Sequence, residues 1–326
     1  MIADRLRALR LVTDTIIQIF PPGVWSSSDW SLLSHSTNYD YTISNSLLMA
    51  KAGLITDDGN SPDISDSCVV GSDVAISVEN DLDGADFIQA HYYSDGDVGI
   101  GGGGTTTKEH SMCTSSASGG GTVHKKYEGY YDGTYYPYFL VGGLTSFHMF
   151  LKASLTGHNY TYEVRTEEIK TIGQSKVARL YKLGTEEVDW VEGYFEGNSR
   201  YSYVTKEADH LSLTADSTGN TVVTTFVTDN VVDLTDIDRL YVMWEGVVGE
   251  HSGSNLSSHL QISTSKTGDH TSYTAEVIKE LTFEKQEAYL DVSSYTGNYY
   301  IKLHCVANST KDMILNVYYV GGLKTS

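Results

Sequence analysis

Hydrophobic and polar residues alternate along much of the chain with a period of two. Near the end of the sequence, Ile301, Leu303 and Cys305 alternate with Lys302 and His304. This pattern is typical of half-buried β-strands, which place successive side chains on opposite faces of a sheet. By the same criterion we expect strands at residues 211–213, 222–227, 240–244, 260–263, 273–277, 289–292, 299–306 and 313–320. So many short strands in so short a segment favour a jelly roll or a related antiparallel sandwich.

A six-residue motif occurs twice. Residues 131–136 read Tyr-Asp-Gly-Thr-Tyr-Tyr and residues 295–300 read Tyr-Thr-Gly-Asn-Tyr-Tyr. The match continues without a gap at an offset of 164 (295 − 131), which aligns Met149 with Met313. Repeated segments of this kind indicate one structural unit built more than once. This register predicts that Met149 and Met313 occupy equivalent strands of two sandwiches.

A second match lies upstream, where Asp81-Leu82 resembles Asp233-Leu234 at an offset of 152 (233 − 81), with Tyr92 opposite Trp244. The 12-residue difference between the two offsets (164 − 152) is expected in loops between the two matched blocks. One register competes with this alignment: the run Val-Gly-Gly-Leu at 141–144 recurs at 320–323, at an offset of 179 (320 − 141). The repeat is therefore predicted, whereas its register stays open between these alignments.

We expect an all-β protein with two tandem antiparallel β-sandwiches of jelly-roll type. The predicted organisation is an attachment segment at 1–56, a first sandwich at 57–158, a charged connector at 159–208 and a second sandwich at 209–326. Strands of the first sandwich are expected at 74–78, 87–93, 135–141 and 149–155, with 39–43 upstream. The acidic run 57–66 is interpreted as a linker, and the glycine-rich segment 99–121 as a long flexible loop.

Residues 3–20 have apolar side chains at helical spacing, and Pro21-Pro22 follows them directly. This pattern predicts an N-terminal helix with a broad apolar face. The face either packs on its own domain or docks on a partner or on symmetry copies, and the sequence leaves both possibilities open. The candidate partner-binding residues are Leu6, Leu9, Ile16 and Phe20.

Composition and charge exclude several classes of function. The chain has 326 residues, with 24 Tyr and 31 Gly beside 4 Pro, which favours aromatic-rich strands joined by glycine turns. A formal charge of −20 would repel phosphate backbones and anionic membranes, so nucleic-acid binding and membrane insertion are not expected. Cys68, Cys113 and Cys305 do not form a disulfide framework. No export signal is recognised, so we expect assembly in a cytoplasm.

Chemistry-bearing motifs do not emerge from the sequence. The glycine-rich segment is not closed by Gly-Lys-Ser or Gly-Lys-Thr, so it does not predict a phosphate loop. The acidic runs lack the order of a calcium loop, and no cysteine or histidine pair has zinc-binding spacing. Neither a Gly-x-Ser-x-Gly elbow nor a His-Glu-x-x-His helix is present. We therefore expect a protein that is not an enzyme and that needs no cofactor or metal.

A resemblance to a known group of proteins rests on short motifs in the last 115 or so residues. Residues 206–211 read Lys-Glu-Ala-Asp-His-Leu, Val-Asp-Leu at 232–234 precedes the strand 239–244, and Leu-Asp-Val-Ser-Ser at 290–294 precedes Tyr-Tyr-Ile at 299–301. This arrangement resembles the carbohydrate-binding-like β-sandwich modules in tail, baseplate and fibre proteins of tailed bacteriophages. The resemblance implies a virion protein that binds other virion subunits and copies of itself, assembled in the host cytoplasm.

Two hypotheses follow from this resemblance. In the first, the sandwiches of a tail, baseplate or fibre protein face outward and bind polysaccharide on the host cell surface. In the second, the protein is purely architectural, as in a capsid-decorating or head-fibre protein, and the sandwiches only pack on neighbours. Aromatic side chains exposed in loops would favour the first hypothesis, and the same side chains buried in subunit contacts would favour the second.

A glycan site needs exposed aromatic rings interleaved with carboxylates and amides, because sugar rings stack on aromatic faces while their hydroxyls form hydrogen bonds. The segment 127–138 and its repeat have that composition. The alternative is that these tyrosines are ordinary strand residues at the edge of a core. The candidate ligand-binding residues are Tyr127, Tyr130, Tyr131, Asp132, Tyr135, Tyr295, Asn298 and Tyr299.

Overall fold

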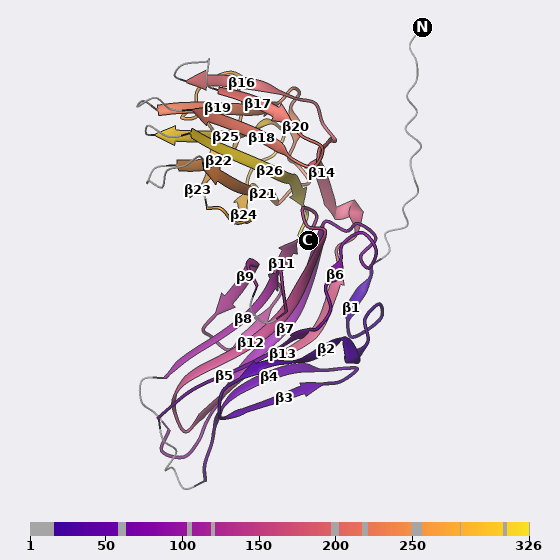
Figure 1. Cartoon of the computed structure of the whole chain (residues 1–326), viewed down its shortest axis with the longest axis vertical. Coiled ribbons are helices and arrows are strands. Elements are labelled where there is room, and N and C mark those ends of the chain that lie inside the picture. The colour runs from indigo at the N-terminus through magenta and orange to yellow at the C-terminus, as the bar shows by residue number, and fades with distance from the viewer. Residues whose placement is uncertain are drawn as a thin grey trace. The chain divides into compact units, whose positions relative to one another are not determined.

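The hydrogen-bonded sheets form two β-sandwiches, the first from strands β1 to β13 and the second from strands β14 to β26 (Figure 1). The computed structural model describes residues 16–57, 63–102, 106–118, 121–196, 202–216, 221–248, 256–280, 282–308 and 312–325. In these residues the helical elements are two single turns of 3-10 helix, η1 (Ser27–Asp29) and η2 (Gln174–Lys176). The all-β sandwich fold expected from the alternating pattern is confirmed.

The first sandwich consists of two antiparallel sheets. Its strands are β1 (Gln18–Phe20), β2 (Trp30–His35), β3 (Tyr39–Ile43), β4 (Leu48–Leu54), β5 (Asp63–Ser72), β6 (Ile76–Ser77), β7 (Phe87–Val98), β8 (Thr107–Ser115), β9 (Val123–Gly129), β10 (Gly133–Tyr135), β11 (Tyr138–Leu140), β12 (Ser146–His158) and β13 (Tyr160–Thr171). One sheet has the order β10-β7-β13-β4-β3, with β1 on β13 and β11 on β7. The other has the order β2-β5-β12-β8-β9, with β6 on β12.

The second sandwich repeats this plan. Its strands are β14 (Val177–Lys182), β15 (Thr185–Glu186), β16 (Trp190–Glu196), β17 (Ser202–Lys206), β18 (Leu211–Asp216), β19 (Thr221–Thr228), β20 (Val232–Asp233), β21 (Arg239–Val248), β22 (Leu256–Ser263), β23 (Ala275–Glu280), β24 (Gln286–Asp291), β25 (Asn298–Asn308) and β26 (Asp312–Leu323). The sheet orders are β15-β14-β26-β18-β17, with β21 between β26 and β24, and β16-β19-β25-β22-β23, with β20 on β25.

Strand pairing decides the register of the repeat. The central strand β12 pairs with β5, β8 and β6, as β25 pairs with β19, β22 and β20, so β12 corresponds to β25. These strands begin at Ser146 and Asn298, and β7 and β21 begin at Phe87 and Arg239, which gives an offset of 152 in both cases (298 − 146 and 239 − 87). The offset of 152 predicted for the upstream block is thus confirmed, and it also holds for β12 and β25, where an offset of 164 was predicted. The alignment of Met149 with Met313 is wrong, because Met313 lies in β26, the counterpart of β13.

Shared irregularities support the same correspondence. Glu167 of β13 is an extra residue opposite β7, and Tyr318 of β26 is an extra residue opposite β21. A hydrogen bond is repeated as well. Ser72 Oγ accepts from the amide of Met149 at 3.0 Å, and Thr228 Oγ1 accepts from the amide of Ile301 at 3.1 Å. Because bulges and side-chain-to-backbone bonds of this kind are specific to a local backbone, the two sandwiches are copies of one unit.

The structure corrects the predicted N-terminal helix. Residues 1–15 lie outside the described part of the chain, but Gln18–Phe20 forms strand β1, and Gln18 pairs with Lys170 of β13. Ile19 and Phe20 are both fully buried in the first sandwich. The apolar residues at this end therefore cover the protein's own core, where strand pairing satisfies their backbone groups.

Three further expectations about the middle of the chain are wrong. Strand β5 begins inside the supposed linker, at Asp63, and β8, which has a buried second half, runs through the supposed glycine-rich loop. The supposed connector 159–208 begins with β13, a central strand of the first sandwich, and continues with the first strands of the second. In β13 the charged residues alternate with Tyr162, Val164 and Thr166, which are buried, so the charges lie on the outer face of a strand.

Candidate functional site

A three-residue connection between two strands displays two of the predicted tyrosines. β9 ends at Gly129 and β10 begins at Gly133, so Tyr130, Tyr131 and Asp132 join the edge of one sheet to the edge of the other. We call these three residues the tyrosine turn. The side chain of Tyr131 is 78% exposed and that of Tyr130 is 48% exposed. Both rings therefore face solvent rather than the core.

Hydrogen bonds hold the backbone of the tyrosine turn in place. The carbonyl oxygen of Tyr131 accepts from Ser94 Oγ at 2.9 Å and from Tyr135 Oη at 2.6 Å. Asp132 Oδ1 accepts from Lys108 Nζ at 2.6 Å. Partial burial would lower the pKa of Lys108, but the hydrogen bonds to Asp132 and Tyr160 raise it above its ordinary value. The turn is thus bonded to three different strands, β7, β8 and β10.

A cluster of aromatic side chains packs behind the turn. We call it the tyrosine cluster, and its members are Tyr92, His110, Tyr127, Tyr135 and Tyr162. The ring of Tyr135 stacks on that of Tyr92 at a centroid distance of 5.2 Å. Tyr127 and Tyr135 are half-buried in this cluster. They therefore support the tyrosine turn from behind, and the surface they could offer a ligand is limited.

His110 lies at the centre of the tyrosine cluster. Its Nδ1 is 2.7 Å from Tyr162 Oη, and its side chain is fully buried. Burial lowers the pKa of His110 from 6.5 to about 4, although the charges of Asp132 and Glu109 work in the opposite direction. Gly129 approaches the ring so closely that an added Cβ would lie 2.5 Å from Nε2. The imidazole is therefore neutral at physiological pH and sits in a closely fitted space.

The candidate residues of the second copy do not form an equivalent site. Tyr295 and Tyr299 contact each other edge to face at 6.1 Å and pack on the core of the second sandwich. Asn298 is exposed, and its backbone pairs with Asp233. At the offset of 152 these residues correspond to 143–147, so the motif similarity to the tyrosine turn does not reflect equivalent positions.

The true counterpart of the tyrosine turn is the connection between β23 and β24. Of its described residues 282–285, Phe283 is 66% exposed. The amide of Gly246 in β21 donates to the carbonyl oxygen of Thr282 at 2.9 Å, which ties this connection to a strand as well. An aromatic ring is thus displayed at the same place in both sandwiches. The sequence offered no signal for Phe283, because a single aromatic residue in a polar loop has no periodicity.

The four predicted partner-binding residues have separate outcomes. Leu6 and Leu9 lie outside the described residues. Ile16 is 52% exposed, whereas Phe20 is fully buried and contacts Trp30 edge to face at a centroid distance of 6.0 Å. Phe20 is therefore a core residue of the first sandwich and not a docking residue.

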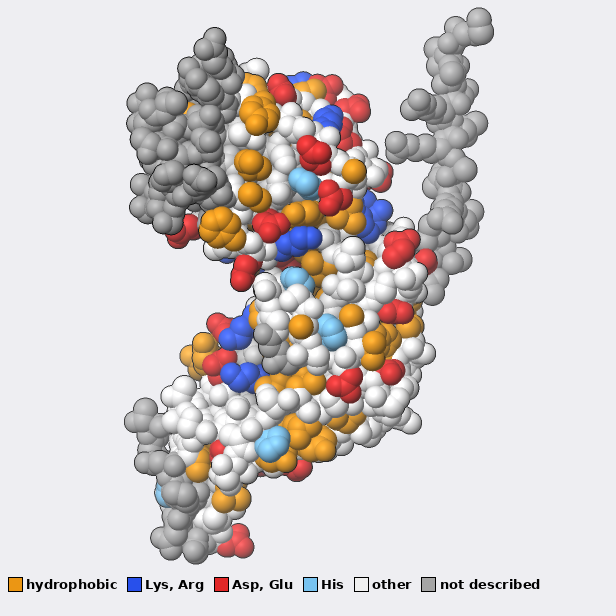
Figure 2. Space-filling model, viewed as in Figure 1, with side chains coloured by type: hydrophobic (Ala, Val, Ile, Leu, Met, Phe, Trp, Pro, Cys, Tyr) orange, Lys and Arg blue, Asp and Glu red, His pale blue; other side chains and the backbone are white. Residues whose placement is uncertain are grey.

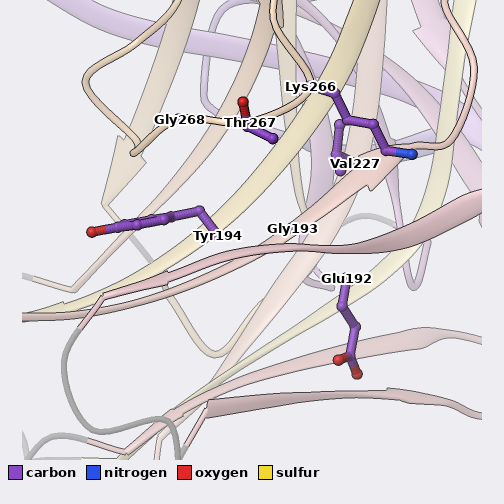
Figure 3. A pocket seen from close by; sticks show the side chains of 7 residues that line it. All are labelled: Glu192, Gly193, Tyr194, Val227, Lys266, Thr267 and Gly268. Atoms are coloured by element: carbon purple, nitrogen blue, oxygen red, sulfur yellow. The ribbon is translucent and has the colours of Figure 1, made fainter.

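The second sandwich contains a pocket that the sequence did not reveal. It has a volume of about 250 Å³ and is lined by Glu192, Gly193, Tyr194, Val227, Lys266, Thr267 and Gly268 (Figure 3). One wall is formed by a bulge in β16. Between Glu192 and Phe195 this strand advances by three residues, while its partner β19 advances by two. Figure 3 shows Tyr194 and Glu192 leaving the β16 ribbon on opposite sides. We call this the β16 pocket.

Other site chemistry is absent from the described residues. No group of His, Cys, Asp and Glu side chains in the described ranges could hold a metal ion. Of the helices that these residues form, none has the length and apolar character needed to cross a bilayer. Cys68, Cys113 and Cys305 are all buried, and none of the three forms a disulfide. On the face shown in Figure 2, acidic side chains are scattered and basic ones lie between them.

No protein-family model and no curated protein matches the chain. Among solved structures, the Spr0440 glycoside hydrolase domain of Endo-D from Streptococcus pneumoniae R6 is similar at 16% identity and a TM-score of 0.33, over 42% of this chain and 22% of that one. TmCBM61 in complex with beta-1,4-galactotriose is similar at 14% identity and a TM-score of 0.27, over 40% of this chain and 86% of that one. The CBM22-1-CBM22-2 tandem domain of Paenibacillus barcinonensis Xyn10C is similar at 10% identity and a TM-score of 0.28, over 90% of this chain and 98% of that one. These TM-scores are low, and the likenesses carry no part of the functional argument.

Proposed function

We propose that the chain is a non-catalytic glycan-binding protein whose first sandwich contacts sugar through the tyrosine turn. The observation that carries this proposal is the ring of Tyr131, which is 78% exposed on a backbone bonded to the neighbouring strands. An exposed ring on a fixed backbone can stack on the apolar face of a sugar with little loss of conformational freedom. Asp132, with Lys108 beside it, supplies a carboxylate and an ammonium for sugar hydroxyls.

The proposed setting is a tailed-bacteriophage virion, in a tail, baseplate or fibre, where the ligand is polysaccharide of the host cell surface. The support for this setting is the resemblance of residues 206–211, 232–234 and 290–294 to modules of such virion proteins. In that setting the chain assembles in the host cytoplasm and contacts other virion subunits and copies of itself. The exposed Tyr130, Tyr131 and Phe283 favour glycan binding over the purely architectural alternative.

The test is a double substitution, Tyr130→Ala with Tyr131→Ala, assayed on an array of bacterial cell-wall polysaccharides. Two lost stacking contacts of about 0.5–1.5 kcal/mol each correspond to binding roughly 5- to 150-fold weaker. The fold should be unaffected, because neither ring packs in the core. Tyr203→Ala is the matched control, since this tyrosine is 52% exposed on β17 of the second sandwich.

Two outcomes would reject the proposal. If the wild-type chain binds no polysaccharide on the array, the architectural hypothesis is favoured. If the double variant binds as the wild type does, the tyrosine turn is not the site.

A further variant, Tyr135→Phe, tests the role of the hydroxyl that holds the turn. It keeps the aromatic ring and loses only the hydrogen bond from the hydroxyl to the Tyr131 carbonyl oxygen. We expect this variant to bind with intermediate affinity, since the turn becomes more mobile.

A further inference from the structure

The bulge in the edge strand β16 sets the direction of Tyr194. Glu192 pairs with Phe226, but the next paired residue of β16 is Phe195. On a regular strand Glu192 and Tyr194 would point to the same side, because they are two positions apart. Figure 3 shows them on opposite sides of the ribbon, which a bulge between them allows. The bulge therefore brings the Tyr194 ring to the pocket that Val227 also lines.

The residue before Tyr194 in the bulge is Gly193, and it contributes only backbone to the pocket. A Cβ added at Gly193 would lie 2.8 Å from the Cγ2 atom of Thr225 and 3.3 Å from the Cγ1 atom of Val227. The bulge thus lies so close to the side chains of β19 that a side chain here would force a neighbour to shift. A glycine at this position lets the bulge pack closely without filling the pocket.

The first sandwich has a bulge at the corresponding place, and there a side chain closes the site. Leu33 of β2 is the extra residue opposite β5. Gly71 is the counterpart of Val227, since the two pair with Phe150 and Lys302 at the offset of 152 (302 − 150). A Cβ added at Gly71 would lie 2.7 Å from the Cδ1 atom of Leu33. The side chain in the bulge therefore covers this position in the first sandwich, whereas the bulge of the second leaves a pocket.

The loop between β22 and β23 forms the wall opposite to the Tyr194 ring. Figure 3 shows this ring edge-on, with Thr267 of the loop across the pocket from it. Ser265 Oγ donates to the Thr267 carbonyl oxygen at 2.7 Å, and Gln261 Nε2 of β22 donates to the His270 carbonyl oxygen at 2.6 Å. These bonds fix the loop within itself and to its own strand. The pocket is thus a slot between a flat aromatic ring and a fixed loop.

The charges around the pocket are already compensated or lie away from it. Lys266, which lines the pocket, forms an ion pair with Asp229. Glu192 is exposed and points away from the ring, so water screens its charge (Figure 3). Lys302 of β25 is fully buried and is not one of the lining residues. The pocket therefore suits an uncharged ligand better than an acid or a base.

We propose that the β16 pocket binds a single uncharged sugar ring, whose C–H face stacks on the Tyr194 ring while its hydroxyls face the loop at Thr267. Tyr194 is 40% exposed, so its ring is accessible to a ligand. Sugars present C–H faces of this kind to aromatic rings. A volume of about 250 Å³ lies just below the range of drug-sized sites, roughly 300–1,000 Å³, and suits one ring. This site lies in the second sandwich and does not depend on the tyrosine turn.

The test uses the whole chain carrying Tyr130→Ala and Tyr131→Ala, so that the tyrosine turn offers no ring to the ligand. The methyl β-glycosides of D-glucose, D-galactose and N-acetyl-D-glucosamine are titrated by saturation-transfer NMR. At least one should bind in the millimolar range, with the strongest saturation at the axial protons of one ring face. Adding Tyr194→Ala should weaken this binding roughly 2- to 12-fold, since one stacking contact is lost. Tyr194→Phe in its place keeps the ring and should restore the binding.

Two controls separate the slot from exposed rings and from charge in general. Tyr203→Ala removes a ring that is 52% exposed on β17, in the other sheet of this sandwich, and should leave binding unchanged. Methyl β-D-glucuronide should bind no more tightly than the glucoside, because Lys266 is already paired with Asp229. Unchanged binding after Tyr194→Ala, or no binding of any of the three neutral glycosides, would overturn the proposal. A clear preference for the glucuronide would contradict the uncharged ligand.

Discussion

The two sandwiches share a backbone plan but use the outer face of the six-stranded sheet differently. In the first, Gly71 and Phe150 lie under Leu33, and the site is closed. In the second, Val227 and Lys302 hold the same paired positions, and a pocket remains. The strand order and the pairing are the same in both cases. A copied fold can therefore gain or lose a surface pocket through a few side chains, without a change of topology.

The connections between the sheets differ in a second way. The tyrosine turn shows two rings and a carboxylate–ammonium pair, whereas the described part of its counterpart shows one ring, that of Phe283. The first sandwich thus concentrates its exposed aromatic surface at a sheet edge, and the second has its pocket on a sheet face.

The largest effect should come from the matched core positions Leu151 and Leu303, which lie at the offset of 152 and are at most 1% exposed. Replacing either with alanine should lower the free energy of unfolding of its own sandwich by about 2–5 kcal/mol, through lost burial and a cavity. Calorimetry should show the two variants shifting different thermal transitions. A single transition that both variants shift equally would show that the sandwiches unfold as one unit.

Acidification should weaken the first sandwich through His110. The folded-state pKa of about 4 is below the ordinary value of 6.5, so the stabilisation is complete above about pH 6.5 and is lost as the pH falls toward 4. The loss from this group is about 3 kcal/mol, at 1.36 kcal/mol per pH unit. The groups that act on His110 are Asp132, Glu109, Lys108 and the surrounding tyrosines.

Urea unfolding of His110→Gln between pH 7 and 4 isolates that contribution. Glutamine can keep a hydrogen bond to Tyr162 but does not titrate, and it adds no ring atom against Gly129. We expect a flatter stability profile than that of the wild type. His35→Gln, at an exposed position of the same sandwich, should retain the wild-type slope. Identical slopes for wild type and His110→Gln would refute the assignment.

The smallest effect concerns the repeated hydrogen bond from a hydroxyl on β5 or β19. Ser72→Ala and Thr228→Val each leave a buried amide without its acceptor, at a cost of about 1–3 kcal/mol. Because the bonds are equivalent, the two losses should agree within about 0.5 kcal/mol, the usual scatter for independent sites. A loss in one sandwich only would mean that the backbone copies differ at this point.

Much of the fold was predictable from alternation, and the errors have identifiable causes. Strands such as 299–306 and 313–320 were found because apolar residues recur on one face of each strand. Strand β13 was missed because Glu163, Arg165 and Glu167 on its outer face made the segment look like a solvated connector. The wrong register came from matching residues of similar turns, whereas the structural register is decided by which strands pair.

The sites were less predictable than the fold. Tyr130, Tyr131 and Asp132 could be proposed from composition alone, but nothing local separates them from Tyr127 and Tyr135, which pack behind them. Lys302 alternates with Ile301 and Leu303 in the manner of any solvated lysine on a strand. Its burial depends on a sheet face covered by polar residues distant in the sequence, and a single sequence does not contain that information.

The extra residue in each C-terminal strand, Glu167 in β13 and Tyr318 in β26, limits how the two copies can change by insertion and deletion. A residue inserted into or deleted from the paired part of the strand beyond the bulge would shift the following residues by one place and exchange their inner and outer faces, since side chains alternate with a period of two. Loops can gain or lose residues without that consequence. Homologues of this chain should therefore vary in length in the connections between strands, and the spacing from each bulge to the end of its strand should stay constant.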